Sequence, residues 1–149
     1  MPLERISTST LLGRLFRTAS IERFIRHFDR HMEYVAFDTY ITDLCVSKNM
    51  RPEHVIIKSG IDRTYGHQLF NGRRKPSRDK VIQLAFGFNS TYDKAQELLK
   101  AARKSPLHPK IKRDAVIIYA LTRQHDINDV QVTLHDLGLP VLGREDRYG

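Results

Sequence analysis

The sequence predicts an all-α protein on the basis of three observations. Apolar residues recur at positions i, i+3, i+4 and i+7 in most segments, which is the spacing of one face of an α-helix. Capping residues, glycines and prolines divide the chain into pieces of helical length. No segment alternates convincingly between apolar and polar residues, and the β-prone run 116–119 has flanks that favour a buried helix. No internal repeat is expected.

The first third of the chain predicts three helices. The first, around residues 11–16, is weakened by Gly13 and Thr18. Ser20 fits the N-cap of the second, and its apolar stripe consists of Ile21, Phe24, Ile25 and Phe28. The third covers about 34–48 and ends at the break 49–52.

The middle of the chain predicts three shorter helices. Pro52 fits the first position of a helix that ends before Gly60, because a proline there loses no hydrogen bond. Asp62 can cap the next helix, which runs to about Asn71, with Gly72 suited to a left-handed conformation after it. The third begins at residues 77–80 and ends near 87, and its inward residues are Val81, Leu84 and Ala85.

The last third predicts three more helices. Ser90-Thr91-Tyr92-Asp93 resembles a capping box with Asp in place of Glu, and it opens a helix to about residue 102. A rigid linker at 105–109 precedes two closing helices near 111–124 and 127–137. Gly138-Leu139-Pro140 ends the last one, and the residues after Pro140 are expected to be frayed.

The composition excludes several classes of protein and favours a polyanionic partner. The 149 residues carry 25 basic and 17 acidic side chains, a net charge of +8. Residues 51–80 hold eight basic and three acidic residues, so this fifth of the chain carries +5 of that excess. No apolar run is long enough to span a membrane, and the N-terminus lacks the order of a signal peptide. With Cys45 as the only cysteine, we expect a cytoplasmic protein without disulfides.

Residues 52–72 have the features of a helix-turn-helix. A short helix, a turn containing Gly60 and a second helix follow one another, with apolar residues on both helices to hold them together. The turn Ser59-Gly60-Ile61-Asp62 and the ending Leu69-Phe70-Asn71-Gly72, followed by basic residues and a proline, resemble the DNA-binding domains of the Cro and phage-repressor (XRE-type) family. The resemblance implies a repressor-like, five-helix domain over residues 36–103, with an N-terminal helical extension at 1–35 and a C-terminal helix pair and tail at 104–149.

The same resemblance assigns roles to individual residues. It implies sequence-specific binding of double-stranded DNA by a bacterial or phage-type transcriptional regulator, in which the second helix enters the major groove. The residues at base-reading positions are Arg63, Thr64, His67 and Gln68. The residues placed to contact phosphates are Asn71, Arg73, Arg74, Lys75 and Arg78.

Gly66 departs from the family pattern. Members usually carry Val, Ile or Ala at this inward position, so the glycine is expected to leave a core position unfilled unless Tyr65 covers it. The alternative function is therefore a protein-interaction adaptor that keeps the helix-turn-helix fold without binding specific DNA.

The remaining candidate residues have structural interpretations. His27 and His31 share a helix face, but the neighbouring Arg26 and Arg30 would repel a metal ion. Cys45 lies among apolar residues and is expected to be a buried thiol. No nucleophile or phosphate-loop motif is present, so we expect neither an enzyme nor a cofactor or metal. Dimers are common among such DNA-binding modules, and the flanking helices are the candidates for a homodimer interface.

Overall fold

The computed structural model describes residues 6–32 and 35–143, and it divides the chain into two compact units, 1–34 and 35–149. All regular structure in the described residues is helical, which confirms the all-α prediction. The segment 104–149 was expected to be separate, but its described residues, 104–143, lie within the second unit. The reason is that Ile117, Leu121 and Leu134 belong to the same apolar core as the residues of 36–103.

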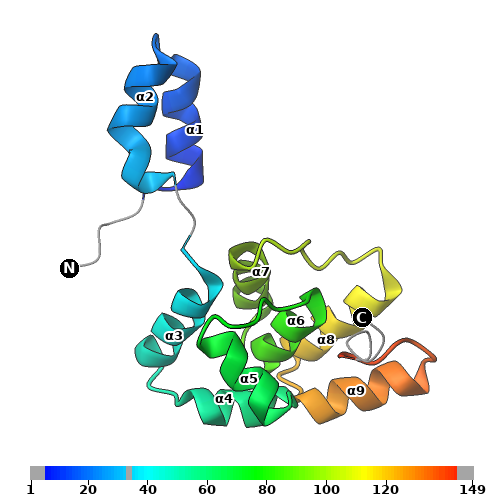
Figure 1. Cartoon of the computed structure of the whole chain (residues 1–149). Helices are drawn as coiled ribbons and strands as arrows, with labels where there is room; N and C mark the ends of the chain where they lie inside the picture. Colours follow the sequence, from blue (N-terminus) through cyan, green and yellow to red (C-terminus); the bar gives the residue numbers. More distant parts are fainter. Residues whose placement is uncertain (1–5, 33–34, 144–149) are drawn as a thin grey trace. The chain divides into compact units, whose positions relative to one another are not determined.

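The first unit is a pair of short helices with a helical turn. It contains α1 (Thr8–Arg17), α2 (Ile21–Phe28) and the 3₁₀ turn η1 (Asp29–His31). Ser20 caps α2 as predicted, since its hydroxyl accepts a hydrogen bond of 3.3 Å from the Arg23 amide. Figure 1 shows α1 and α2 side by side, and Phe24 and Phe28 are the buried side chains of these helices.

The second unit contains the other helices. They are α3 (Phe37–Ser47), α4 (Pro52–Ser59), α5 (Arg63–Phe70), α6 (Arg78–Gly87), α7 (Tyr92–Ala101), α8 (Lys112–Thr122) and α9 (Ile127–Asp136). Helix α3 begins three residues later than the predicted start at 34, and that residue lies outside the described ranges. Pro52 is the first residue of α4 and Asp62 caps α5, as predicted, and α6 begins within the predicted start 77–80, with Ser77 as its N-cap.

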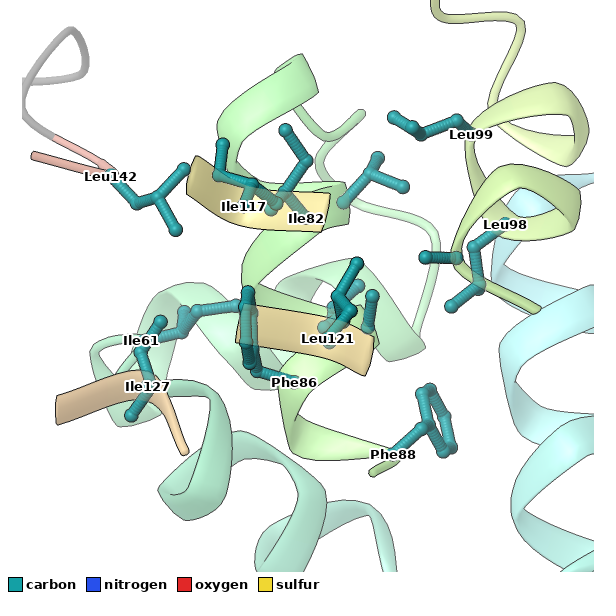
Figure 2. Close-up of a cluster of buried hydrophobic side chains, with 14 of the residues drawn as sticks. Ile61, Ile82, Phe86, Phe88, Leu98, Leu99, Ile117, Leu121, Ile127 and Leu142 are labelled. Carbon is teal, nitrogen blue, oxygen red and sulfur yellow. The ribbon is translucent and has the colours of Figure 1, made fainter. Parts of the chain in front are cut away.

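Helix α6 is the centre of the second unit. The sequence predicted one inward face, but every residue from Asp79 to Gly87 is buried. Helices α4, α7 and α9 all pack against it. Figure 2 shows its Ile82 and Phe86 among Ile117 and Leu121 of α8. A helix covered on all sides shows no amphipathic stripe, so periodicity could not reveal its position.

Two helix starts differ from the predicted capping. Thr91, not Ser90, caps α7, since its hydroxyl accepts a hydrogen bond of 3.2 Å from the Lys94 amide. The capping box expected there is instead present at α9. The Asp126 carboxylate accepts from the Asp129 amide at 2.8 Å, and the Asp129 carboxylate accepts from the Asp126 amide at 3.0 Å.

The expectation that the chain has no repeat was wrong. Helices α6–α7 and α8–α9 form two similar hairpins, with Arg-Asp-Lys-Val-Ile at 78–82 matching Arg-Asp-Ala-Val-Ile at 113–117. The two hairpins also make the same hydrogen bonds at corresponding positions. The Gln96 side chain binds both the amide and the carbonyl of Leu107, and Gln131 binds Leu142 in the same way. Each of these residues in the second hairpin lies 35 positions after its counterpart.

The two hairpins are joined by crossed ion pairs. Arg78 of α6 donates two hydrogen bonds, of 3.1 and 2.9 Å, to Asp114 of α8. Arg113 of α8 donates two, of 2.8 and 2.7 Å, to Asp79 of α6. Both aspartates are buried, so each arginine supplies the charge that makes the carboxylate tolerable in the core.

The segment after Pro140 is docked as far as residue 143, in contrast to the fraying expected from the sequence. Leu142 is buried, and Arg113 also donates to the carbonyls of Pro140 and Val141. The Gly143 amide donates to Asp79 at 3.0 Å. Local sequence gave no sign of these partners, since they lie 27 or more positions away.

Candidate nucleic-acid interface

Helices α4 and α5 are joined by a tight turn at Gly60, Ile61 and Asp62. Gly60 has a φ of +68°, a left-handed conformation that glycine adopts without a Cβ clash. Asp62 then caps α5, accepting a hydrogen bond of 3.1 Å from the Tyr65 amide. The buried residues Val55, Ile56 and Leu69 hold the two helices on the core.

Gly66 does not leave an empty core position, contrary to the expectation from sequence. A Cβ atom built there would lie 2.5 Å from Cγ2 and 2.7 Å from Cγ1 of Ile56, so the Ile56 side chain already fills the space. The glycine therefore permits a close approach between α4 and α5. Tyr65 does not fill the position at Gly66. It is half-buried beside two basic side chains, with the Arg74 guanidinium 4.5 Å and the Lys80 ammonium 5.0 Å from its ring centroid.

The four predicted base-reading residues do not share one environment. Arg63 and Thr64 are exposed in the first turn of α5, and the Arg63 side chain is 77% exposed although its Nε donates to Glu53 at 2.9 Å. Gln68 is half-buried, and its Oε1 accepts from Arg74 Nε at 3.1 Å. His67 is also half-buried, and its Nε2 is buried without a hydrogen-bond partner.

The loop after α5 presents most of the predicted phosphate-binding residues. Asn71, Arg73, Arg74 and Lys75 are all exposed. The Asn71 side chain accepts from the Arg73 amide at 3.0 Å, and the Arg74 amide donates to the Gln68 carbonyl at 3.2 Å. The loop backbone is thus held by α5, and the arginine side chains extend from a defined base.

Arg78 has a different role from its neighbours in the loop. Its side chain is only 25% exposed, and besides Asp114 it donates to the carbonyls of Ser105 and Pro106, each at 3.0 Å. Five guanidinium N–H groups are available to an arginine, and these partners engage most of them. Asp114, which directs Arg78 into the scaffold, lies 36 positions away in the sequence.

Sequence reasoning missed an acidic neighbour of the α4–α5 turn. A Cβ on Gly60 would lie 3.3 Å from Cγ1 of Ile127, which places the first turn of α9 against the turn. That first turn carries the exposed Asp129, and the N-cap before it is the exposed Asp126. No local signal links these acids to the turn, because the contact depends on how α9 packs on α6.

Other candidate groups are accounted for by packing. Cys45 is 2% exposed, and burial raises the pKa of its thiol. The rings of His27 and His31 pack against Phe28, with centroid distances of 4.6 and 6.3 Å. Within residues 6–32 and 35–143, no group of three or more His, Cys, Asp or Glu side chains is arranged to hold a metal ion. None of the helices in those ranges has the length and apolarity needed to cross a membrane.

The arrangement is therefore an exposed helix N-terminus beside an exposed basic loop. Comparisons of this chain with protein-family models, with curated proteins and with solved structures found no match.

Proposed function

We propose that the second unit binds double-stranded DNA, with α5 in the major groove and the loop at 71–75 on the phosphate backbone. The observation that carries this proposal is the position of Arg74. Its side chain contacts both Gln68 and the ring of Tyr65 on α5, so the basic loop and the exposed side of α5 form one continuous surface. A duplex needs this combination, since phosphate contacts fix the register and base contacts read the sequence.

Individual residues take different parts in this proposal. Arg63 and Thr64 are the first groups to reach base edges, and Gln68 follows one turn later, positioned by Arg74. Asn71, Arg73, Arg74 and Lys75 contact phosphates. We leave Arg78 and His67 out of the interface, because Arg78 is engaged with Asp114 and His67 Nε2 is buried.

Arg63 must leave Glu53 before it can bind a base. Both side chains are substantially exposed, at 77% and 49%. An exposed ion pair contributes only about 0.2–1 kcal/mol, so opening it costs less than the roughly 1–3 kcal/mol that a bidentate base contact provides. The pair is therefore compatible with base reading.

The first experiment measures affinity for a labelled random duplex by fluorescence anisotropy at several salt concentrations. The logarithm of the affinity should fall with log salt by about 0.9 for each phosphate neutralised. Arg73→Ala combined with Arg74→Ala should weaken binding and make this slope shallower. Lys110→Ala with Lys112→Ala removes the same charge from exposed positions outside the α5 region and should change the slope little.

The second experiment tests base reading. A preferred site is selected from random duplexes, and binding is measured over its single-base variants for the wild type, Arg63→Ala and Gln68→Ala. Each substitution should relax the preference at one or two base pairs by roughly 5- to 150-fold while binding to random duplex changes little. If the wild type has no duplex affinity near physiological salt, the adaptor function replaces this proposal.

A further inference from the structure

The first unit contains a basic hollow that the proposed function does not use. Helices α1 and α2 together line a space of about 810 Å³. Its lining includes Phe24 and Phe28, which are only 4% and 6% exposed. Its polar lining consists of Arg14, Arg17, Thr18, Arg23, Arg26 and His27.

Within residues 6–32 and 35–143, the four arginines have no acidic partner. No ion pair or hydrogen bond from the side chains of Arg14, Arg17, Arg23 or Arg26 is present among the described residues, and all four are exposed. No carboxylate is found among the described residues that line the hollow. Glu22, the acid within α2, has its carboxylate near the Ser20 hydroxyl, at 3.2 Å. Four guanidinium groups around one space attract an anion and repel a cation.

The chemistry of the lining suits phosphate groups. Guanidinium groups bind phosphate oxygens bidentately, and four of them line this space. The space is much larger than one phosphate group needs, and four arginines can match the charge of several. The two phenylalanine rings are too deeply buried to stack on a planar ligand, so recognition rests on the anionic groups.

We propose that this hollow binds a ligand that carries several linked phosphate groups. The ligand is either a free polyphosphorylated compound or the phosphodiester backbone of a nucleic acid, which share this chemistry. The site lies in the first unit and does not depend on DNA binding by α5.

The experiment uses the full chain and inorganic tripolyphosphate in isothermal titration calorimetry. All proteins carry Arg73→Ala and Arg74→Ala, so that the loop of the second unit does not contribute. Arg17→Ala with Arg26→Ala should lower the tripolyphosphate affinity by at least about tenfold, since a charge-assisted hydrogen bond contributes about 1.5–3 kcal/mol. Arg30→Ala is the matched control, because Arg30 is an exposed arginine of η1 outside the lining, and it should change the affinity by less than about threefold.

A second variant separates binding from folding. Arg17→Lys with Arg26→Lys keeps the charge but removes the bidentate geometry, so it should bind tripolyphosphate with an intermediate affinity and have an unchanged far-UV circular dichroism spectrum. The proposal is overturned if tripolyphosphate does not bind, or if the Arg17/Arg26 alanine variant and the Arg30 variant bind it equally.

A labelled duplex then identifies the source of the phosphates. If Arg17→Ala with Arg26→Ala weakens both tripolyphosphate and duplex binding, the hollow takes a phosphodiester backbone. If it weakens only tripolyphosphate binding, the hollow takes a free phosphorylated compound. Failure of DNA binding by α5 is distinguishable from both of these outcomes. In that case, restoring Arg73 and Arg74 leaves the duplex affinity unchanged.

Discussion

Substitution of Gly66 by alanine tests whether the contact between α4 and α5 is limited by space. The added Cβ would lie 2.5 Å from Cγ2 and 2.7 Å from Cγ1 of Ile56, which is closer than carbon atoms approach without movement. Overpacking of this kind costs about 1–3 kcal/mol. Alanine recovers about 0.5–1 kcal/mol through its higher helix propensity. Gly66→Ala should therefore lower the free energy of unfolding by about 1 kcal/mol.

A second substitution, Ile56→Ala, removes the side chain that the added methyl group would contact. Ile56→Ala alone deletes the three atoms nearest to the new Cβ and leaves a cavity, at a cost of about 2–5 kcal/mol. In that background Gly66→Ala places a methyl group in the vacated space and gains the helix propensity. It should then stabilise the protein by about 1 kcal/mol, giving a coupling energy of about 2 kcal/mol between the two sites.

The free energies are measured by urea unfolding followed by far-UV circular dichroism, since the chain has no tryptophan. Gly13→Ala is the control, because a Cβ at Gly13 meets nothing closer than 3.9 Å in α1. It should not destabilise the chain. A coupling energy below about 0.5 kcal/mol would mean that Ile56 does not limit this position, and the explanation of Gly66 would be wrong.

Four further predictions concern stability and reactivity. Asp79→Asn should destabilise the chain by about 3–5 kcal/mol in urea unfolding, because it removes the buried carboxylate that accepts two hydrogen bonds from Arg113, whereas Glu97→Gln at an exposed pair should cost less than about 1 kcal/mol. Gln124→Gly should raise the free energy of unfolding by up to about 1 kcal/mol, because Gln124 has a φ of +58°; a loss of stability would contradict this. Burial raises the pKa of the Cys45 thiol, so near neutral pH it should react with a disulfide reagent far more slowly in the native chain than in urea, and equal rates would place it at the surface. A fragment of residues 36–103 should show a less cooperative thermal transition by circular dichroism than the full chain, because removing α8 and α9 uncovers α6.

Local capping and turn chemistry predicted much of the helical framework. Pro52, Asp62 and Ser77 each act on the next turn of their own helix, so their roles are visible in a few residues of sequence. The repeat was harder to see, because the two hairpins share few identical residues beyond their Arg-Asp-x-Val-Ile starts. Their similarity lies in backbone contacts such as those of Gln96 and Gln131.

The candidate site likewise contains some residues whose positions the local sequence indicates and others whose positions depend on distant parts of the chain. The exposure of Arg73 and Lys75 follows from a glycine-containing loop of polar residues, which sequence can indicate. The positions of Arg78 and His67 depend on tertiary partners. Asp114 holds Arg78 in the scaffold, and the packing of α5 buries His67 Nε2. Sequence spacing alone cannot separate an arginine that faces solvent from one that faces a buried aspartate.

The crossed pairing of the two hairpins has the form of a symmetric dimer contact inside one chain. In a two-fold interface, residue i of one copy meets residue j of the other and the reverse holds as well, which is the relation of Arg78 with Asp114 and Arg113 with Asp79. The surfaces that α6–α7 and α8–α9 present to each other therefore carry corresponding residues. The linker at 102–111 connects them, and opening it would let α8–α9 of one chain dock on α6–α7 of another with the Arg78–Asp114 and Arg113–Asp79 pairs kept. Domain exchange is thus a route to self-association that this architecture provides.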